Sequence, residues 1–410
     1  MDLQDIRNLS RWKLLLIVDI LFLIALAVSS AGSMTPIDDT NLTVHNQTEV
    51  TFIATQGGSA QLYPHAGEIQ AVHNPSKQVI WRNDDYRRYM DVDVLDNDTI
   101  LTVAGNYTNG EVRRVALIFN WREDRLVEKF QVPHDVHDID YLGNNEYAIA
   151  DKANARAYVY NPETDNITWE YDFREYFTDD GGPGTHEYTH LNDIDPEMNQ
   201  SAFLLSPRNF DRVFLINRSN KEIIFELGEE DNYDILYEQH NPDMLSYDPY
   251  TVIVSDSEND RIIEYQQQED GSWVEKWSYS GELNWPRDGD RLPNGNTLIT
   301  DTVGNRVVEV TPRGGVVWEY DTPVGPYEAE RYGTPDGSNH IPFNGTVEPE
   351  EERENAVESS FDKLYSLVGH WIMPAGTGKV EFAGFMLLAL INMAYIGFRI
   401  VESSRNNILS

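Results

Sequence analysis

Three polar side chains stand at the two ends of one expected hairpin, which runs from Thr189 to Arg208. The hairpin opens with His190-Leu-Asn192 and ends on Arg208. In an antiparallel hairpin the start of the first strand and the end of the second lie at the same end, so we expect these three side chains to converge at one rim. An imidazole, an amide and a guanidinium together form a cradle suited to an anionic, tetrahedral group.

Histidines recur at related places along the chain. Five of the ten fall at or just before the expected start of an inner strand: His134, His137, His186, His190 and His240. Trp285 and Arg287 hold the corresponding places in the last repeat. If adjacent repeats bring these residues to one mouth, several imidazoles would meet there.

Three interpretations of this cluster compete. Each histidine taken alone could simply cap a strand end. Three histidines together could hold zinc, nickel or copper. Arg208 at the same rim would repel a cation, however, so the residues favour an anion site with a histidine nucleophile and no bound metal.

The elements that must position these residues are short strands in repeated pairs. Six segments share one outline, in which an alternating strand, a polar turn and a second strand lead to an aromatic residue. They are Glu68 to Trp81, Arg114 to Phe130, Arg156 to Trp169, Arg212 to Phe225, Arg261 to Trp277 and Arg306 to Trp318. Each is expected to be the outer hairpin of a four-stranded unit.

An acidic opening marks the inner hairpin of most units. The first acids of these openings are Asp91, Asp138, Asp193, Asp243 and Asp288. Four strands repeated every 40 to 50 residues or so are typical of a β-propeller, and six outer hairpins indicate six blades. The sequence therefore predicts an all-β, six-bladed propeller over residues 50–332, with two stacked sheets as the alternative. How the first blade closes the ring is not evident, although Val50 to Gln56 could supply an inner strand.

Some of the repeated residues are expected to hold the fold. The opening aspartates recur from blade to blade, and so does an Asp-x-x-x-x-Arg element at Asp151/Arg156, Asp256/Arg261 and Asp301/Arg306. A residue pattern that recurs from blade to blade is best explained by a role in holding the fold. Chemistry should therefore be sought where the blades differ.

Composition restricts the class of protein. Lys plus Arg is 31 against 69 for Asp plus Glu, a formal charge of -38, which excludes nucleic-acid binding by a basic surface. Dispersed acid of this kind suggests a protein kept soluble in high salt, which points to a halophilic archaeon as the source; an ordinary acidic ectodomain is the alternative. The chain has no cysteine, so disulfides, thiolate catalysis and Cys-ligated metals are excluded.

Two apolar stretches predict a membrane location. Leu14 to Ser30 follows three basic residues and reads as a signal peptide or an uncleaved anchor, and Phe382 to Ile400 reads as a transmembrane helix. Residues 1–31 would then be the leader or anchor, 32–49 a linker, 333–378 an acidic stalk, 379–401 the span and 402–410 a cytoplasmic tail. Eight Asn-x-Ser/Thr sequons between the two stretches fit a glycosylated domain on the extracytoplasmic face.

The chain resembles the arylsulfotransferase family, six-bladed propellers that move a sulfuryl group from one phenol to another without a nucleotide sulfate donor. The resemblance covers roughly residues 50–332 and is most specific at His190, Asn192 and Arg208, followed by His240 one blade later. It implies that His240 is the nucleophile that becomes sulfated. His190, Asn192 and Arg208 would bind the sulfonate oxygens, and no cofactor is implied.

One further family histidine should lie a blade earlier, at His134 or His137, and His134 is preferred because it stands just before the strand. The substrates would be an aryl sulfate and a phenolic or other hydroxyl acceptor, exchanged in two steps through a sulfohistidine. Two other functions compete with this one. The first is a non-catalytic propeller that binds a surface glycan or protein, and the second is a metal-dependent lyase or hydrolase on the same scaffold.

Overall fold

The computed structural model describes residues 49–56, 67–108, 111–177, 188–334 and 340–345, together with residues 384, 386, 388 and 392. The predicted leader or anchor at 1–31, nearly all of the linker and stalk, most of the span at 379–401 and the tail lie outside these ranges, as does His186. In the part of the chain that the structure describes, no helix combines the length and the apolar character needed to cross a bilayer.

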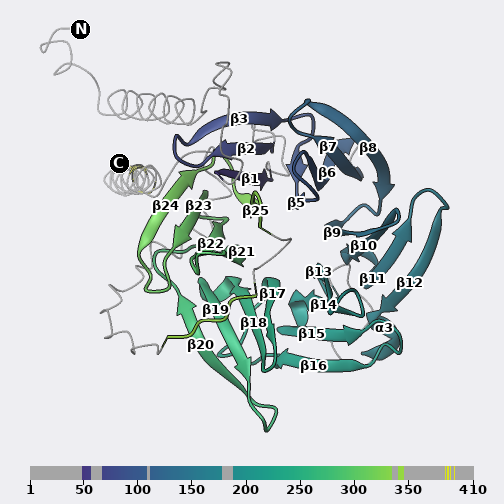
Figure 1. The fold of residues 1–410 in the computed structure, drawn as a ribbon, viewed down its shortest axis with the longest axis vertical. Coiled ribbons are helices and arrows are strands. Elements are labelled where there is room, and N and C mark those ends of the chain that lie inside the picture. The colour runs from purple at the N-terminus through teal and green to yellow at the C-terminus, as the bar shows by residue number, and fades with distance from the viewer. Residues whose placement is uncertain are drawn as a thin grey trace, which may run out of the picture. The chain divides into compact units, whose positions relative to one another are not determined.

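Six antiparallel sheets form the blades of a propeller, and Figure 1 shows them arranged around one axis. This confirms the predicted all-β, six-bladed architecture and excludes two stacked sheets. All six predicted outer hairpins are present as the third and fourth strands of their blades.

The strands of each blade follow one another from the axis outward. The first blade has β25 (Pro326–Arg331), β1 (Val50–Thr55), β2 (Ile69–His73) and β3 (Gln78–Asn83); the second has β4 (Arg88–Tyr89) with β5 (Asp93–Val94), β6 (Thr99–Thr108), β7 (Glu111–Asn120) and β8 (Arg125–Val132). The third has β9 (Val136–Gly143), β10 (Glu146–Asp151), β11 (Arg156–Asn161) and β12 (Asn166–Asp172); the fourth has β13 (Leu191–Glu197), β14 (Ala202–Pro207), β15 (Arg212–Asn217) and β16 (Ile223–Gly228).

The fifth blade has β17 (His240–Tyr247), β18 (Tyr250–Asp256), β19 (Arg261–Gln267) and β20 (Trp273–Tyr279), and the sixth has β21 (Pro286–Arg291), β22 (Thr297–Asp301), β23 (Arg306–Val310) and β24 (Val316–Asp321). Short helical turns follow some strands: η1 (Lys152–Asn154), α3 (Phe173–Tyr176), η2 (Arg208–Phe210) and η3 (Ser257–Asn259).

The first blade joins the two ends of the propeller. Its innermost strand is β25, from the C-terminal end, which pairs antiparallel with β1. The segment at 50–56 is therefore the second strand from the axis. Closing the ring in this way removes the exposed edges that an open array of strands would leave.

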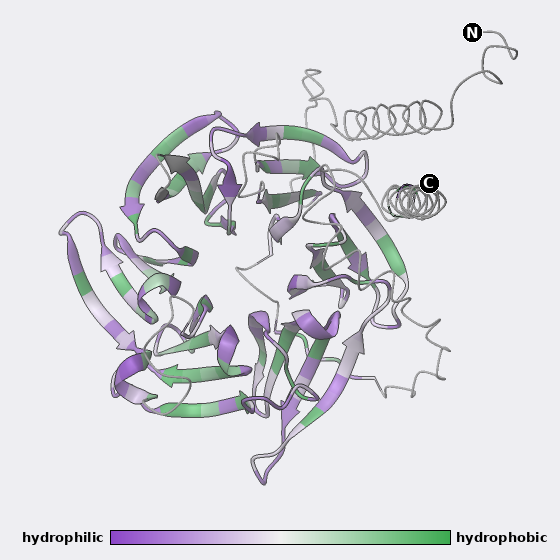
Figure 2. Cartoon of the chain, turned by 180° about the vertical axis from the view of Figure 1, so that it is seen from behind, coloured by the Kyte–Doolittle hydropathy of each residue, from purple (hydrophilic) through white to green (hydrophobic). Residues whose placement is uncertain are grey.

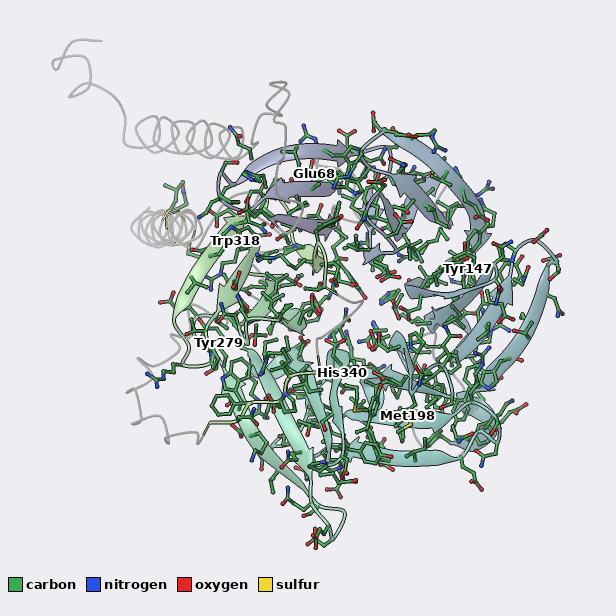
Figure 3. All side chains as sticks on the ribbon, viewed as in Figure 1. Glu68, Tyr147, Met198, Tyr279, Trp318 and His340 are labelled. Carbon is green, nitrogen blue, oxygen red and sulfur yellow. The ribbon has the colours of Figure 1, made fainter. Side chains whose placement is uncertain are left out.

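The hydrophobic core is divided among the contacts between neighbouring blades. Each of six buried clusters is formed mainly by strands from two adjacent blades, as the one that includes β10, β11, β13 and β14 illustrates. Figure 2 shows that the hydrophobic segments lie in the strands while the connecting turns are hydrophilic. In Figure 3 side chains fill the space between blades, with Tyr147 of β10 among them.

The aromatic residues that end the outer hairpins link each blade to the next. The indole Nε1 of Trp169 donates to the carbonyl of Arg218 (2.8 Å), and that of Trp318 donates to the carbonyl of Asn74 (2.9 Å). A large apolar ring with one polar group suits this position, since the ring packs in the core while its N–H finds a partner.

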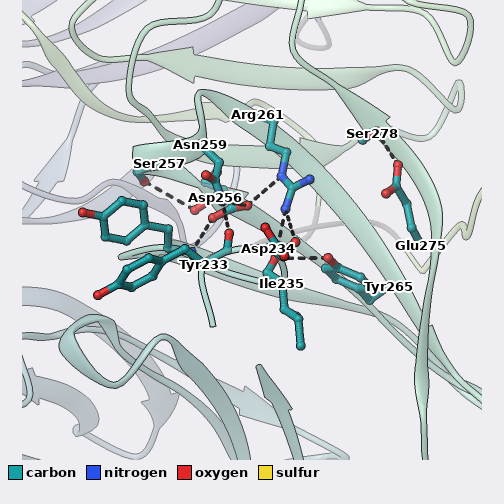
Figure 4. A network of polar contacts seen from close by, with 12 residues as sticks. Tyr233, Asp234, Ile235, Asp256, Ser257, Asn259, Arg261, Tyr265, Glu275 and Ser278 are labelled. Carbon is teal, nitrogen blue, oxygen red and sulfur yellow. Dashed lines mark hydrogen bonds and ion pairs between the residues drawn. The ribbon is translucent and has the colours of Figure 1, made fainter. Parts of the chain in front are cut away.

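The Asp-x-x-x-x-Arg element is structural, as predicted. The buried Asp256 carboxylate accepts from Arg261 Nε (2.6 Å) and Asn259 Nδ2 (2.8 Å), which Figure 4 shows. Asp151 and Asp301 make the same ion pair with Arg156 and Arg306. Each pair ties the end of one strand to the start of the next, across the turn between them.

Candidate functional site at one end of the channel

The predicted site residues stand where the innermost strands begin. In the fourth, fifth and sixth blades the pairing of the two inner strands is interrupted at this point, between Leu191 and Ile194, His240 and Asp243, and Pro286 and Asp288. Such bulges redirect side chains and are frequent next to active sites. His190 (φ 47°) and Trp285 (φ 56°) also hold left-handed backbone conformations, which cost roughly 1 kcal/mol or more each for residues other than glycine.

We call the residues gathered there the mouth: His137, His190, His240, Arg208 and Arg287. His190 lies beside His137, with 5.4 Å between the centres of their rings. Burial lowers the pKa of His190 most strongly, and the charge of Arg208 lowers it further, with smaller effects from His137, Lys152 and His240. The structure thus brings the predicted His190, Arg208 and His240 together.

The contacts at Nδ1 of His240 favour one tautomer. Its Nδ1 lies 2.8 Å from Ser257 Oγ, and that hydroxyl lies 2.7 Å from the carbonyl of Pro286 and 3.4 Å from that of Ser255. Both carbonyls can only accept, so the serine donates its proton to a carbonyl and accepts the Nδ1–H of the imidazole. Nε2 of neutral His240 consequently carries the lone pair.

His240 is neutral at ordinary pH. Burial lowers its pKa well below the usual value; the nearby positive charges of Arg287 and Arg208 act in the same direction, as does protonation of His137, while the carbonyl of Glu238 opposes them. A neutral imidazole with its lone pair on a defined nitrogen is the form that attacks an electrophile.

Arg208 has a carboxylate partner. Its Nη2 forms an ion pair with Glu238, two residues before His240, while its backbone N–H donates to the carbonyl of His190. Pro207 stands where the third, fifth and sixth blades carry an aspartate, so the Asp-x-x-x-x-Arg element is missing from the fourth blade. Part of the charge of Arg208 is therefore already balanced.

Asn192 is fully buried and contacts the next blade. Its Nδ2 donates to the carbonyl of Gln239 (2.9 Å), the residue directly before His240. One of its two amide N–H donors is thus engaged in positioning the strand that carries His240. The predicted sulfonate contact would have to use the other one.

Of the two histidines expected a blade earlier, the structure places His137, and not the preferred His134, beside His190. His134 is exposed, and the contact it makes through its carbonyl, with Arg114 Nε, involves no imidazole. His137 is buried against His190, because it lies inside β9 and not before it. Its Nδ1 is 2.9 Å from the Tyr327 hydroxyl and its Nε2 is 3.5 Å from Asp135.

His137 sits in a balanced electrostatic environment. Burial lowers its pKa to about 3, which Asp135 partly offsets. Asp135 in turn contacts Arg114 (3.1 Å) and Lys152 (3.1 Å). Both ring nitrogens are engaged, so His137 is suited to positioning and is a poor nucleophile.

Four residues of this region are not among the predicted site residues: Ser257, Asp135, Tyr327 and Arg287. The repeat pattern marks Arg287 only as the counterpart of the histidines in the last blade. A usable signal exists in the sequence, since Arg287 directly precedes Asp288 just as His137 precedes Asp138 and Asn192 precedes Asp193. Tyr327 likewise directly precedes Glu328. For Ser257 no such signal is present, because it acts on a histidine of another strand.

A metal centre made of histidines is not supported by the geometry. Among the described residues, the groups whose ligand atoms approach one another closely enough for a metal are Asp91 with Asp93 and Glu328, and Asp243 with Asp288 and Asp290. Neither contains a histidine. Both lie deeper along the innermost strands than the mouth.

No family model matches the chain, and no curated protein matches it in sequence. Among solved structures it is similar to the periplasmic gluconolactonase PpgL of Pseudomonas aeruginosa, at 13% identity and a TM-score of 0.48 over 70% of this chain and 86% of that one. A protein of unknown function from Bacteroides caccae matches at 12% identity and a TM-score of 0.48, over 70% and 97% of the two chains. Virginiamycin B lyase from Staphylococcus aureus matches at 14% identity and a TM-score of 0.37, over 57% and 69%.

Proposed function

We propose that this propeller transfers a sulfuryl group from an aryl sulfate to a phenolic or other hydroxyl acceptor through a sulfohistidine on His240, as the resemblance to arylsulfotransferases implies. The observation that carries the proposal is the hydrogen-bond chain from His240 Nδ1 through Ser257 Oγ to the Pro286 carbonyl. It leaves the lone pair on Nε2, beside the positive charges of the mouth.

In the first step Nε2 would attack the sulfur of the aryl sulfate. An N–S bond forms, the bond from sulfur to the aryl oxygen breaks, and a phenolate leaves with that electron pair. The ring keeps its Nδ1 proton and becomes cationic, which strengthens the bond that Ser257 accepts. By analogy with phosphoryl transfer, negative charge spreads over the three equatorial oxygens, where fixed cationic donors stabilise it most.

In the second step the acceptor hydroxyl would take the sulfuryl group and restore neutral His240. His190 is only partly buried, and a bound sulfonate would offset the charge of Arg208 that lowers its pKa, so it is placed to take the proton from the incoming hydroxyl. His240 exposes only 1% of its surface, so we expect a neighbouring side chain to move when substrate enters. Trp285, partly exposed and with its ring 5.3 Å from that of His240, is the residue placed to do this.

The predicted span at 379–401 would hold this enzyme at the cell membrane, with the propeller on the extracytoplasmic face. The N-terminal segment would add a second anchor if it is not cleaved. Its substrates would then be extracytoplasmic aryl sulfates and hydroxyl compounds.

A single-turnover labelling experiment tests the proposal. The full chain is incubated in high salt with a fluorogenic aryl sulfate and no acceptor, and its peptides are then analysed by mass spectrometry under neutral conditions. We expect one equivalent of phenol and an added SO₃ on the peptide that carries His240. His134→Asn, which alters an exposed histidine outside the mouth, serves as the matched control and should give the same adduct.

Other outcomes would favour the competing functions. Steady phenol release without an adduct would indicate direct hydrolysis. No reaction with aryl sulfates, together with turnover of a lactone or an activity restored by added metal, would indicate a hydrolase or lyase. Either result would overturn transfer through His240.

A further inference from the structure

Buried and partly buried arginines in the described part of this protein are generally paired with carboxylates. Arg114 pairs with Asp135, Arg291 with Glu264 and Arg331 with Glu309, at 2.9–3.1 Å. Such pairing is expected, because a guanidinium transferred out of water loses strong solvation that only a charged partner restores.

Arg287 is the exception. Its residue exposure is 8%, and neither Nε nor Nη1 has a hydrogen-bond partner among the described residues. The guanidinium instead contacts the rings of Trp285 (4.4 Å) and Tyr327 (4.5 Å). These aromatic contacts hold the charge in place but satisfy neither N–H group.

Arg287 is also close to the proposed nucleophile. It stands at the bulge where β21 begins, and after burial its charge is the largest influence on the pKa of His240. Trp285 contacts both residues. Burial lowers the pKa of Arg287 to about 10, so the guanidinium is still charged at neutral pH.

We propose that Arg287 is the principal anion-binding residue of the mouth and that its Nε–H and Nη1–H groups donate to sulfonate oxygens of the bound aryl sulfate. This rests on the proposed function and deepens it. Arg208, whose charge Glu238 already balances, then has the lesser part in binding the sulfonate. The same donors would bind free inorganic sulfate, which gives a readout separate from turnover.

The experiment measures sulfate binding to the full chain by calorimetry, in wild type, Arg287→Gln, Arg287→Lys and Arg331→Gln. Arg331→Gln removes a partly buried arginine that is paired and lies outside the mouth, so it controls for general destabilisation. Thermal melting of each variant is recorded alongside. Inorganic phosphate and acetate are titrated under the same conditions.

We expect Arg287→Gln to weaken sulfate binding by about tenfold or more, Arg287→Lys to restore part of it, and Arg331→Gln to bind as wild type. Wild-type affinity in a folded Arg287→Gln variant would overturn the assignment. Acetate binding without sulfate binding in the wild type would overturn the choice of a sulfonate. If Arg287→Gln does not fold, Arg287→Lys decides: weakened binding with normal melting supports the guanidinium donors, and unchanged affinity overturns them.

The two proposals can fail separately. Sulfate binding that depends on Arg287, with no adduct on His240, would leave the anion site standing and remove sulfuryl transfer. An adduct that forms in Arg287→Gln at the wild-type rate, with unchanged sulfate affinity, would leave the transfer standing and remove the role of Arg287.

Discussion

Two neighbouring layers of residues in the central channel differ in how much the residue type changes from blade to blade. The deeper layer, the channel ring, takes one carboxylate from every blade: Asp91, Asp138, Asp193, Asp243, Asp288 and Glu328. The residues directly before these acids are different in every blade: Met90, His137, Asn192, Pro242, Arg287 and Tyr327.

The channel ring holds the blades together. Asp91 accepts from the N–H of Ile139 in the next blade (3.2 Å), and Asp138 accepts from the N–H of Ile194 (2.6 Å). The mouth makes no such repeated bond among the residues that the structure describes. The difference teaches that in a repeat protein the position that stays constant serves the fold, and the position beside it that changes can serve chemistry.

Burial favours the neutral form of the ionisable groups in both layers. It therefore shifts the pKa values of the acids and of the imidazoles in opposite directions. Burial and the neighbouring acids raise the pKa of Asp193 and Glu328 well above the usual values, whereas burial keeps the three imidazoles of the mouth neutral. The positive charge that remains at the mouth comes from Arg208 and Arg287. Substitutions in the two layers should therefore affect different measurements.

The sharpest test of the comparison is His240→Asn. The amide can still bond Ser257, but no nucleophilic lone pair is left, so single-turnover release of phenol should fall by on the order of 10⁵-fold or more. The thermal midpoint should stay close to that of the wild type. A variant that keeps substantial turnover would show that the mouth does not supply the nucleophile.

The next effect concerns the tautomer of His240. Ser257→Ala removes the acceptor of the Nδ1–H, so the tautomer with the lone pair on Nε2 is no longer favoured. A buried donor without a partner costs about 1–3 kcal/mol, and we expect the single-turnover rate to fall roughly 10- to 100-fold. Ser255→Ala is the control, since its carbonyl remains. An unchanged rate in Ser257→Ala would separate the hydrogen-bond chain from the chemistry.

The channel ring should show the reverse behaviour. Asp138→Ala leaves the buried N–H of Ile194 without its acceptor, which should destabilise the fold by about 1–3 kcal/mol, while the reaction at His240 continues. Asp138→Asn keeps an acceptor and removes a charge, so it should be near wild type in denaturant unfolding. If Asp138→Ala melted normally but lost activity, the division between the layers would be wrong.

The smallest expected effect is the pH dependence that one acid contributes. Burial raises the pKa of Asp288 to about 7, whereas in the unfolded chain it is about 3.9. A folded pKa raised in this way gives stability that is present below the unfolded pKa and is lost as pH rises through the folded one.

The stability of wild type relative to Asp288→Asn should therefore decrease between pH 5 and pH 7, by at most about 1.4 kcal/mol per pH unit, and level off above pH 7. Chemical denaturation at constant salt measures this difference. The neutral imidazoles contribute equally to both proteins and cancel. If the stability of wild type relative to Asp288→Asn instead increased with pH, Asp288 would be ionised in the folded state.

Much of the fold followed from local pattern. Alternating strands, polar turns and the aromatic residues that close them defined all six outer hairpins, and the Asp151/Arg156 element and its two counterparts formed the ion pairs expected of them. Strand pairs of this kind depend on residues close in the chain. The placement of His190, Arg208 and His240 at one end of the channel followed for the same reason, since every innermost strand starts there.

Contacts between distant parts of the chain decided the rest. β25 completes the first blade by pairing with β1, which lies near the other end of the propeller sequence. No residue pattern within Pro326–Arg331 indicates that partner. The choice of His137 over His134 depended on where β9 begins.

The chemistry of the site was decided in the same way. The lone pair of His240 is fixed by Pro286 in the next blade, the charge of Arg208 is balanced by Glu238, and Arg287 is left without a carboxylate among the described residues. Sequence by itself determined that His190, Arg208 and His240 reach the mouth. Only the packing of blade against blade determined which of them are paired, because a hydrogen bond or an ion pair depends on distances that local sequence does not encode.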